Sequence, residues 1–454
     1  MRFLNCAASS LEGHRPWQSG WSGVGVRRMR LAMRRWPRYL RGVMSSHNQT
    51  AMSRWRHPQC FCAPLLALAL VSLIGLGSLR GAEPAAVSPE EDVATPEPFG
   101  CPQKPFTKSK RLARITESGG VPEIEDAVTK ALQSLNRTQQ PDGSWPGGPG
   151  MTALAVLAYL GQGEAMMSPE FGEPCLKGIV ALIDLATKND GHFSSTPGDK
   201  SYSHDHGIAT YALAEAAVWC KRVRFDIPKL DDTVRRAGQF IIDHQHIGGG
   251  WEPGYEKTGD GGGDLGITAW QLMALRACFL TKLEFRDLAP CVVRSLKFIE
   301  SLQIESGAFV CRPNAPPDAT HLSLTGAAIL CFQIWQKGNL SVPRHGAKFR
   351  SENSKFDFNG ESADLYGHFF ESQAMINRGG EQWKRYRALT LNQLLENQNP
   401  DGSWKAPGGG TKVRTLAPDA IANAHQRTCL CVLMLEIYYH YLTTIPQIRI
   451  ERGG

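Results

Sequence analysis

The sequence predicts an all-α fold in which about six pairs of helices close into a ring. A short Gly- and Asp-rich turn recurs along the chain, and each copy separates an amphipathic stretch from an apolar one. The apolar stretches are hydrophobic on nearly all sides, which is typical of helices buried on most faces. Helix pairs often stack into open solenoids. Here an inner ring of buried helices inside an outer ring of amphipathic helices satisfies both patterns.

The recurring turn closes on a tryptophan or phenylalanine. Its five copies are QQPDGSW (139–145), TKNDGHF (187–193), HIGGGW (246–251), IESGAF (304–309) and NQNPDGSW (397–404). Glycine permits a positive φ, Asp and Ser bond nearby backbone groups, and the aromatic packs the turn onto a neighbour. The gap of 95 residues between Phe309 and Trp404 is about twice the first gap of 48. One copy in this interval has therefore lost its turn.

The composition is that of a globular protein. Of 454 residues, 42% are hydrophobic and 20% are charged. This balance excludes a wholly disordered chain, a collagen-like chain and a multi-span membrane protein. The net charge of +7 comes from residues 1–82, which hold 12 of the 50 Lys and Arg but only 1 of the 43 Asp and Glu. The remainder carries −4, so we expect no nucleic-acid partner.

The N-terminal part resembles a secretory signal. An uncharged apolar run at 63–79 follows Arg54 and Arg56 and is followed by small residues ending at Ala82. We expect a signal peptide or a retained anchor at 52–82. This predicts a secreted or periplasmic protein, or one anchored in the membrane only through its N-terminus.

The remaining boundaries follow from composition. Residues 1–51 are expected to be an untranslated or disordered extension, 83–120 a Pro-rich linker, 121–442 the ring and 443–454 a tail. Nine cysteines follow Ala82. Nine is an odd number, and an exported protein could oxidise some of them, but their pairing cannot be read from spacing.

The Q-x-x-DGSW turn after a helix, repeated along roughly 121–442, resembles the QW-type repeat of squalene and oxidosqualene cyclases and of protein prenyltransferase β subunits. The turns at 139–145 and 397–404 match closely and the other three loosely. The resemblance implies an α/α toroid and, if the protein is an enzyme, a cyclase or prenyltransferase-like transferase or isomerase. Toroids also serve as polysaccharide lyases, glycosidases and binding domains, so the fold alone does not define the function.

The catalytic motifs of these families are incomplete here. The cyclases protonate an alkene with an Asp of a D-x-D-D-T motif. The nearest string, KLDDTV at 229–234, lacks the first Asp and opens an amphipathic helix, where Asp and Thr are expected as caps. The prenyltransferases hold zinc with Asp, Cys and His. Asp264 matches the Asp, but Gly266 and Arg427 stand at the Cys and His positions. Any metal or cofactor therefore stays unknown.

Asp and His residues recur where the buried helices begin. Counted back from a recurring Thr or Ala of these helices, they are His204, Asp205, His206, Asp264, His321 and His425. The starts of the inner helices of a ring converge on one end of its centre, so these residues could share one mouth. Asp and His transfer protons and bind metals. For an enzyme, we expect Asp205 and Asp264 as acid or base, with His206 and His321 as further catalytic groups.

Other residues are candidates for substrate binding. His204 and His425 flank the same mouth, and Tyr211 and Trp270 lie on buried helices. Aromatic faces steady carbocations in terpene cyclases, but aromatics at helical spacing also form ordinary core. Likewise, Asp before a helix is a good N-cap and His can satisfy a turn carbonyl. Both readings stay open.

Three functions remain. The first is an exported squalene cyclase-like or prenyltransferase-like toroid whose central cavity binds an apolar, for instance isoprenoid, ligand. The second is a non-catalytic scaffold that binds a protein or a cell-envelope component; it predicts a ring filled by side chains and mouth residues that do not converge. The third is a polysaccharide-processing toroid, which predicts a polar groove with exposed aromatics and paired carboxylates.

Overall fold

The structure is a computed structural model, and it describes residues 106–163, 165–194, 202–257, 262–318, 322–360, 362–408, 420–440 and 442. They belong to one compact unit, Val93–Gly454. This part of the chain contains thirteen α-helices, three short 3-10 helices and no β-strand. The expectation of an all-α fold is confirmed.

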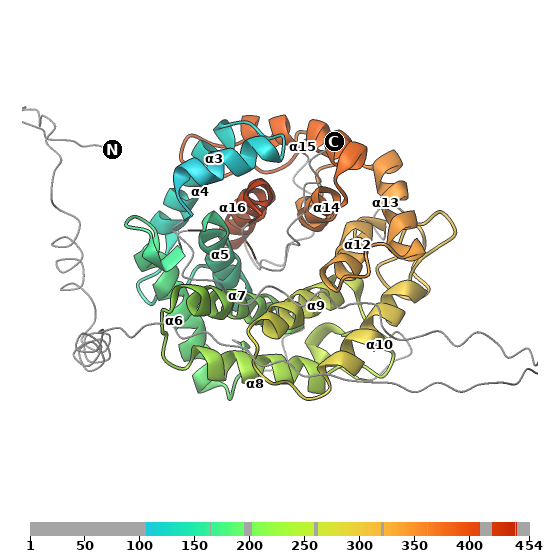
Figure 1. Ribbon diagram of the computed structural model, residues 1–454, viewed down its shortest axis with the longest axis horizontal. Coiled ribbons are helices and arrows are strands. Elements are labelled where there is room, and N and C mark those ends of the chain that lie inside the picture. Colours follow the sequence, from blue (N-terminus) through green and yellow to red (C-terminus); the bar gives the residue numbers. More distant parts are fainter. Residues whose placement is uncertain are drawn as a thin grey trace, which may run out of the picture. The chain divides into compact units, whose positions relative to one another are not determined.

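The helices form two concentric layers (Figure 1). The outer layer consists of α4 (Glu123–Thr138), α6 (Gly172–Lys188), α8 (Leu230–Asp243), α10 (Leu288–Ser301), α13 (Ser341–Asn353) and α15 (Gly380–Glu396). The inner layer consists of α5 (Pro149–Gln162), α7 (Tyr202–Val223), α9 (Leu265–Leu280), α12 (Thr325–Ile334), α14 (Leu365–Arg378) and α16 (Ala420–Glu436). Each inner helix packs on the next, and α16 packs back on α4 and α5. The predicted ring of six pairs is therefore closed, as an α/α toroid.

The apolar patterns explain which helix lies in which layer. All fourteen residues of α5 are buried, because neighbours cover it on every side. In contrast, α8 buries one face and exposes Arg235 and Arg236 on the other. Burial of such stripes is the main favourable contribution to the free energy of folding. The two kinds of helix therefore sort into two layers.

The inner helices run in the same direction. Lys221 near the end of α7 donates from Nζ to the backbone oxygen of Thr281, just after α9 (2.7 Å). Arg276 near the end of α9 lies 5.5 Å from the ring centre of Trp335, just after α12. Similar contacts join the ends of α12 and α14 and of α5 and α16. We call the end of the ring formed by these C-terminal helix ends the base, and the opposite end the mouth.

The aromatic residues of several turns hold an outer helix and the following inner helix together. Trp145 Nε1 donates to the backbone oxygen of Leu135 in α4 (2.8 Å), and the backbone N–H of Trp145 donates to Thr152 Oγ1 in α5 (3.0 Å). The same two bonds recur at Trp251, and Phe309 keeps the bond to its threonine. The recurring threonine of the inner helices is therefore a structural residue.

Where the turn carries a glutamine, this residue joins one helix pair to the next. Gln139 Nε2 donates to the backbone oxygen of Pro174 in α6 (2.9 Å), and Gln398 Nε2 donates to that of Ala127 in α4 (2.8 Å). Gln398 belongs to the last pair and Ala127 to the first. This contact, which we call the seam, therefore closes the ring across 271 residues of sequence. Gly402 has a φ of +89°, and a Cβ there would overlap the backbone of α4.

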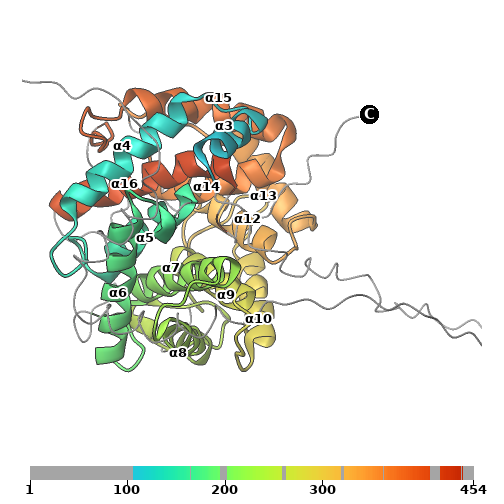
Figure 2. The same ribbon diagram turned by 60° about the vertical axis from the view of Figure 1, so that its left-hand side comes forward.

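A further helix, α3 (Lys108–Glu117), precedes the ring, within the segment that composition assigned to the linker. Arg111 in α3 forms a buried ion pair with Glu125 in α4 (Nη2 to Oε1, 2.8 Å), and Tyr439 also donates to Glu125 (2.8 Å). Figure 2 shows α3 beside α4 and α15. Contacts with α4 and the end of the ring hold this helix in place. Its own sequence has no long apolar pattern, so composition alone predicted a linker.

Several sequence expectations fall on other parts of the chain. The extension, the signal or anchor and the tail lie outside the described residues. Within the described ranges, no helix has the length and apolar character needed to cross a bilayer. Eight of the nine cysteines after Ala82 are described, and all eight are buried and unpaired. Burial raises the pKa of several of their thiols, for example Cys278, which disfavours the reactive thiolate.

Candidate functional site

Asp264 caps an inner helix. Its Oδ1 accepts hydrogen bonds from the backbone N–H groups of Gly266 (2.8 Å) and Ile267 (3.1 Å) at the start of α9. Its Oδ2 forms an ion pair with Arg312 Nε (3.1 Å). Both carboxylate oxygens are thus used in holding the helix start and the neighbouring turn, which favours the capping alternative. Asp364 caps α14 in the same way by accepting from Gly367 N (3.1 Å), although the sequence comparison of helix starts did not single it out.

The structure brings Asp205 and His425 to the start of the same helix, α5. Asp205 is buried, and a Cβ at Gly150 would overlap its Oδ1. His425 bonds the backbone of Met151 and stacks on Trp145, with ring centres 6.2 Å apart. Burial lowers the pKa of His425 to about 4, so its imidazole is neutral at pH 7.

His206 faces the outer layer. Its Nε2 lies 3.1 Å from the backbone oxygen of Ala237 in α8, and its ring packs against Phe193 and Phe240. Burial lowers its pKa to about 3, and its Nδ1 has no hydrogen-bond partner among the described residues. His204 in the same turn is half-buried. His321 lies outside the described residues. Asp205 and His425 therefore meet at the start of α5, whereas His206 and Asp264 have separate surroundings.

The expected caps of α8 are not caps. Lys229 occupies the N-cap position with no side-chain bond, and Asp231 and Asp232 lie in the first turn. Asp231 pairs with Lys221 (3.2 Å) and Asp232 with Arg235 (3.2 Å). The helix begins at Leu230, two residues earlier than Asp231 as the N-cap would require, so these acids act through the helix dipole and ion pairs.

Tyr211 and Trp270 lie inside the ring. Trp270 stacks on Phe369 with ring centres 5.2 Å apart, and its Nε1 donates to Tyr366 OH (2.9 Å). The ring centre of Tyr211 is 6.4 Å from that of Trp270. A nearby cavity of about 10 Å³ is lined by Leu157, Tyr211, Phe369, Gln373, Leu433, Glu436, Ile437 and Leu442. This volume holds one water molecule.

Glu436 in this cavity was not anticipated. It is 3% exposed, and neither carboxyl oxygen has a hydrogen-bond partner among the described residues. Burial raises the pKa of Glu436 well above its ordinary value, and the nearby Glu125 adds to the shift. Burial therefore favours the protonated form of this carboxyl group. A single acid in the apolar stretch TCLCVLMLEIYY was the available signal.

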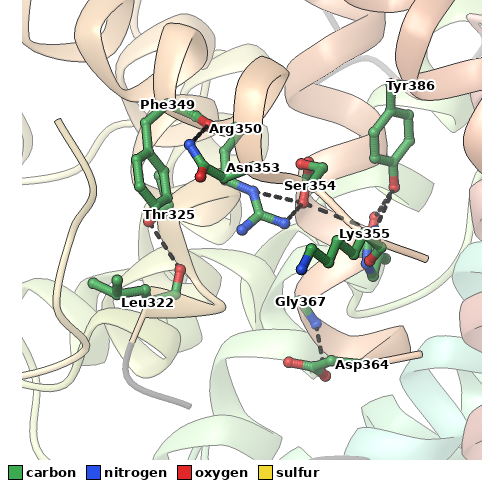
Figure 3. Close-up of polar contacts among 12 residues, drawn as sticks. Leu322, Thr325, Phe349, Arg350, Asn353, Ser354, Lys355, Asp364, Gly367 and Tyr386 are labelled. Atoms are coloured by element: carbon green, nitrogen blue, oxygen red, sulfur yellow. Dashed lines mark hydrogen bonds and ion pairs between the residues drawn. The ribbon is translucent and has the colours of Figure 1, made fainter. Parts of the chain in front are cut away.

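A second unanticipated cluster joins α13 to α14 where the recurring turn is absent (Figure 3). Arg350 donates from Nε to Glu371 Oε2 (2.9 Å), and Ser354 donates to Oε1 of the same carboxylate. His368 lies beside it, with Nδ1 3.0 Å from Tyr386 OH. Burial alone would raise the pKa of Glu371, but the Arg350 guanidinium, His368 and the hydrogen bonds from Arg350 and Ser354 together lower it. The cluster is a buried ion pair that fastens two helices.

A groove of about 800 Å³ runs along α8. Its lining, which we call the α8 groove, is Asp190, His192, Arg235, Arg236, Gln239, Phe240, Asp243, Glu284, Phe285 and Arg286. Gln239 Nε2 donates to Asp243 Oδ1 (2.8 Å), and its Oε1 accepts from the backbone N–H of Arg286 (2.9 Å). Arg236 pairs with Asp190 (3.3 Å). These bonds join side chains of α8 to the turn after α6 and to the turn after α9.

Metal binding finds little support in the described ranges. In that part of the chain, no three His, Cys, Asp or Glu side chains form a group that could hold a metal ion.

Comparisons with known proteins concern the fold. No protein-family model matches the chain, and no curated protein matches its sequence. A GH76 α-mannanase of Bacteroides thetaiotaomicron superposes with a TM-score of 0.52 at 9% identity, covering 73% of this chain and 98% of that one. A type II terpene cyclase from Scytonema gives a TM-score of 0.47 at 13% identity, covering 70% and 99%. The chain therefore has an α/α toroid fold like that of the mannanase.

Proposed function

We propose that this protein is an exported α/α toroid that binds a neutral, hydroxyl-rich polysaccharide of the cell envelope in the α8 groove. The observation that carries this proposal is the lining of the groove, which combines three arginines, three acids and three aromatic rings. The opposite charges balance, so the groove has no preference for an ionic polymer. Carboxylates accept hydrogen bonds from sugar hydroxyls, and guanidinium groups donate hydrogen bonds to them. The faces of aromatic rings pack on the C–H faces of sugars.

The size and rigidity of the groove support the same function. Its volume of about 800 Å³ is typical of ligand sites. Gln239 bridges Asp243 to the turn at Arg286, so the polar groups need little ordering on binding. A toroid that binds a polysaccharide combines the scaffold and polysaccharide alternatives. In this function the α8 groove binds the ligand, and the mouth residues act in helix capping and packing.

A second candidate is the apolar ligand in the ring. It is favoured by the aromatic lining at Tyr211 and Phe369 and by Glu436, whose pKa burial raises, so that its protonated form would be a hydrogen-bond donor in an apolar site. An isoprenoid is far larger than the cavity of about 10 Å³. This function therefore requires the side chains around Leu442 to move. Mass spectrometry of lipids extracted from the purified protein tests it, with Phe369→Ala as the variant that enlarges the cavity.

Binding to a panel of neutral and acidic polysaccharides, measured by affinity electrophoresis and calorimetry, tests the groove. We expect a neutral polysaccharide to bind, and Phe285→Ala or Arg236→Ala to weaken it at least about tenfold, as loss of a central contact does. Arg344→Ala on α13 is the matched control, because Arg344 is exposed and lies outside the groove. Wild-type affinity in both groove variants, or a preference for acidic polymers, would contradict the proposal.

A further inference from the structure

The base of the ring carries a patch that neither the fold nor the α8 groove explains. It lies at the ends of α9 and α12 and in the turns that follow them. We call it the base patch, and it consists of Arg276, Phe279, Lys282, Trp335, Lys337 and Leu340. Phe279 is 41% exposed and Leu340 is 49% exposed, whereas most large apolar side chains of the ring are buried.

Two cations flank the exposed ring of Phe279. Arg276 Cζ lies 5.3 Å and Lys282 Nζ 5.1 Å from its centre, and Arg276 also lies over the Trp335 ring. Such contacts hold cations beside apolar surface. The same combination of aromatic rings with Lys and Arg is used at the boundary between lipid headgroups and acyl chains.

The base patch contains three cations and no acid. The acids that follow α9 are Glu284 and Asp287 in the turn to α10, and Glu284 lines the α8 groove. Arg222 and Arg224 at the end of α7 add positive charge at the same end of the ring, where Asp226 and Asp231 also lie and Asp231 pairs with Lys221 (3.2 Å). An anionic surface is therefore the complementary partner.

The chain enters the ring at the base. Phe106, the first described residue, lies beside Tyr439, with ring centres 6.5 Å apart, and Tyr439 directly follows the end of α16. The Ser118 hydroxyl after α3 also donates to the Tyr438 backbone oxygen (3.2 Å). The first described residue therefore lies at the end of the ring that carries the base patch.

We propose that the base patch docks on an anionic lipid surface, with Phe279 and Leu340 at the level of the headgroups and the three cations on lipid phosphates. This holds whether or not the α8 groove binds a polysaccharide, because the two surfaces share no residue. Each Lys or Arg near an anionic bilayer strengthens binding about fivefold. The attraction is electrostatic and weakens as salt rises.

Hydrogen exchange of the full chain, with and without vesicles, tests the proposal by location. Vesicles of 30% phosphatidylglycerol in phosphatidylcholine should slow exchange in the segments around 276–282 and 335–340, and pure phosphatidylcholine should not. In Lys282→Gln/Lys337→Gln, the equilibrium constant for this contact should fall about 25-fold. Lys188→Gln/Lys405→Gln is the matched control, since both lysines are exposed residues of mouth turns.

Protection confined to residues before 106 would overturn the proposal, because the N-terminal segment would then bind lipid alone. Equal protection by neutral vesicles, or an equal effect of the control pair, would also overturn it. Loss of polysaccharide binding in the base-patch variant would assign the patch to the groove's ligand instead. Circular dichroism of both pairs excludes unfolding as the cause.

Discussion

Removal of Arg350 should strongly destabilise the ring. In Arg350→Met the Glu371 carboxylate, 1% exposed, loses its ion-pair partner. Breaking a buried pair on one side costs about 3–5 kcal/mol, because the remaining charge is desolvated and unpaired. The unfolding entropy of a ring of this size is roughly 0.7 kcal/mol/K, so we expect the melting temperature to fall by about 4–7 °C at pH 7. Arg350→Met/Glu371→Leu removes both charges and should recover most of this loss.

The pH dependence sharpens the test. Arg350 helps to lower the pKa of Glu371 below its ordinary value of 4.5, so the pair's contribution is present above pH 4.5 and is lost as pH falls through the folded-state pKa. The difference between wild type and variant should therefore be largest at pH 7 and shrink in acid. Differential scanning calorimetry measures both, and exposed Arg344→Met on α13 is the control. A change no larger than the control's, or a double variant less stable than Arg350→Met, would refute the reasoning.

Two further variants probe the seam and the cavity. Gln398→Ala removes bonds to Ala127 O and Gly402 O, and should lower the free energy of unfolding by about 2 kcal/mol in chemical denaturation, whereas exposed Gln140→Ala should change it by less than about 0.5 kcal/mol. Equal losses would mean that the seam bonds carry no special weight. The pKa of Glu436 is raised on folding, so its contribution is full below pH 4.5 and declines as pH rises toward the folded-state value. Glu436→Gln should therefore gain stability relative to wild type as the pH rises above 4.5, and a difference that stays constant with pH would contradict the raised pKa of Glu436.

The two layers and the ring could be predicted because both depend on local patterns. The turns at Trp145 and Trp404 mark the helix ends, and the apolar stretches after them identify the inner helices. The structure adds why Trp, Gln and Thr recur: each makes a bond that holds a neighbouring helix. Asp264 illustrates the limit of such patterns, since capping and catalysis place the same residue at the same helix position.

The remaining sites depend on contacts between distant segments. Glu436 looks like an isolated polar residue of a helix end, and only the packing of α16 on α5 and α14 encloses it. Arg236 and Phe285 belong to stretches that are ordinary solvent-exposed surface in sequence. They become a groove only because the turn after α9 lies beside α8. The periodicity of a sequence describes one helix at a time, so it does not predict contacts between side chains of distant segments.

The seam has a consequence for how this protein forms. The first helix pair, α4 and α5, packs against α16, which is synthesised last. The apolar flank of the first pair therefore has no partner during most of synthesis. A chain shortened at its C-terminal end would keep that flank uncovered and would be prone to aggregation. Phe106 and Tyr439 are adjacent, however, so the two ends of the ring can be linked and new termini opened at another exposed turn. A circularly permuted chain would keep every helix contact while changing which pair is synthesised last.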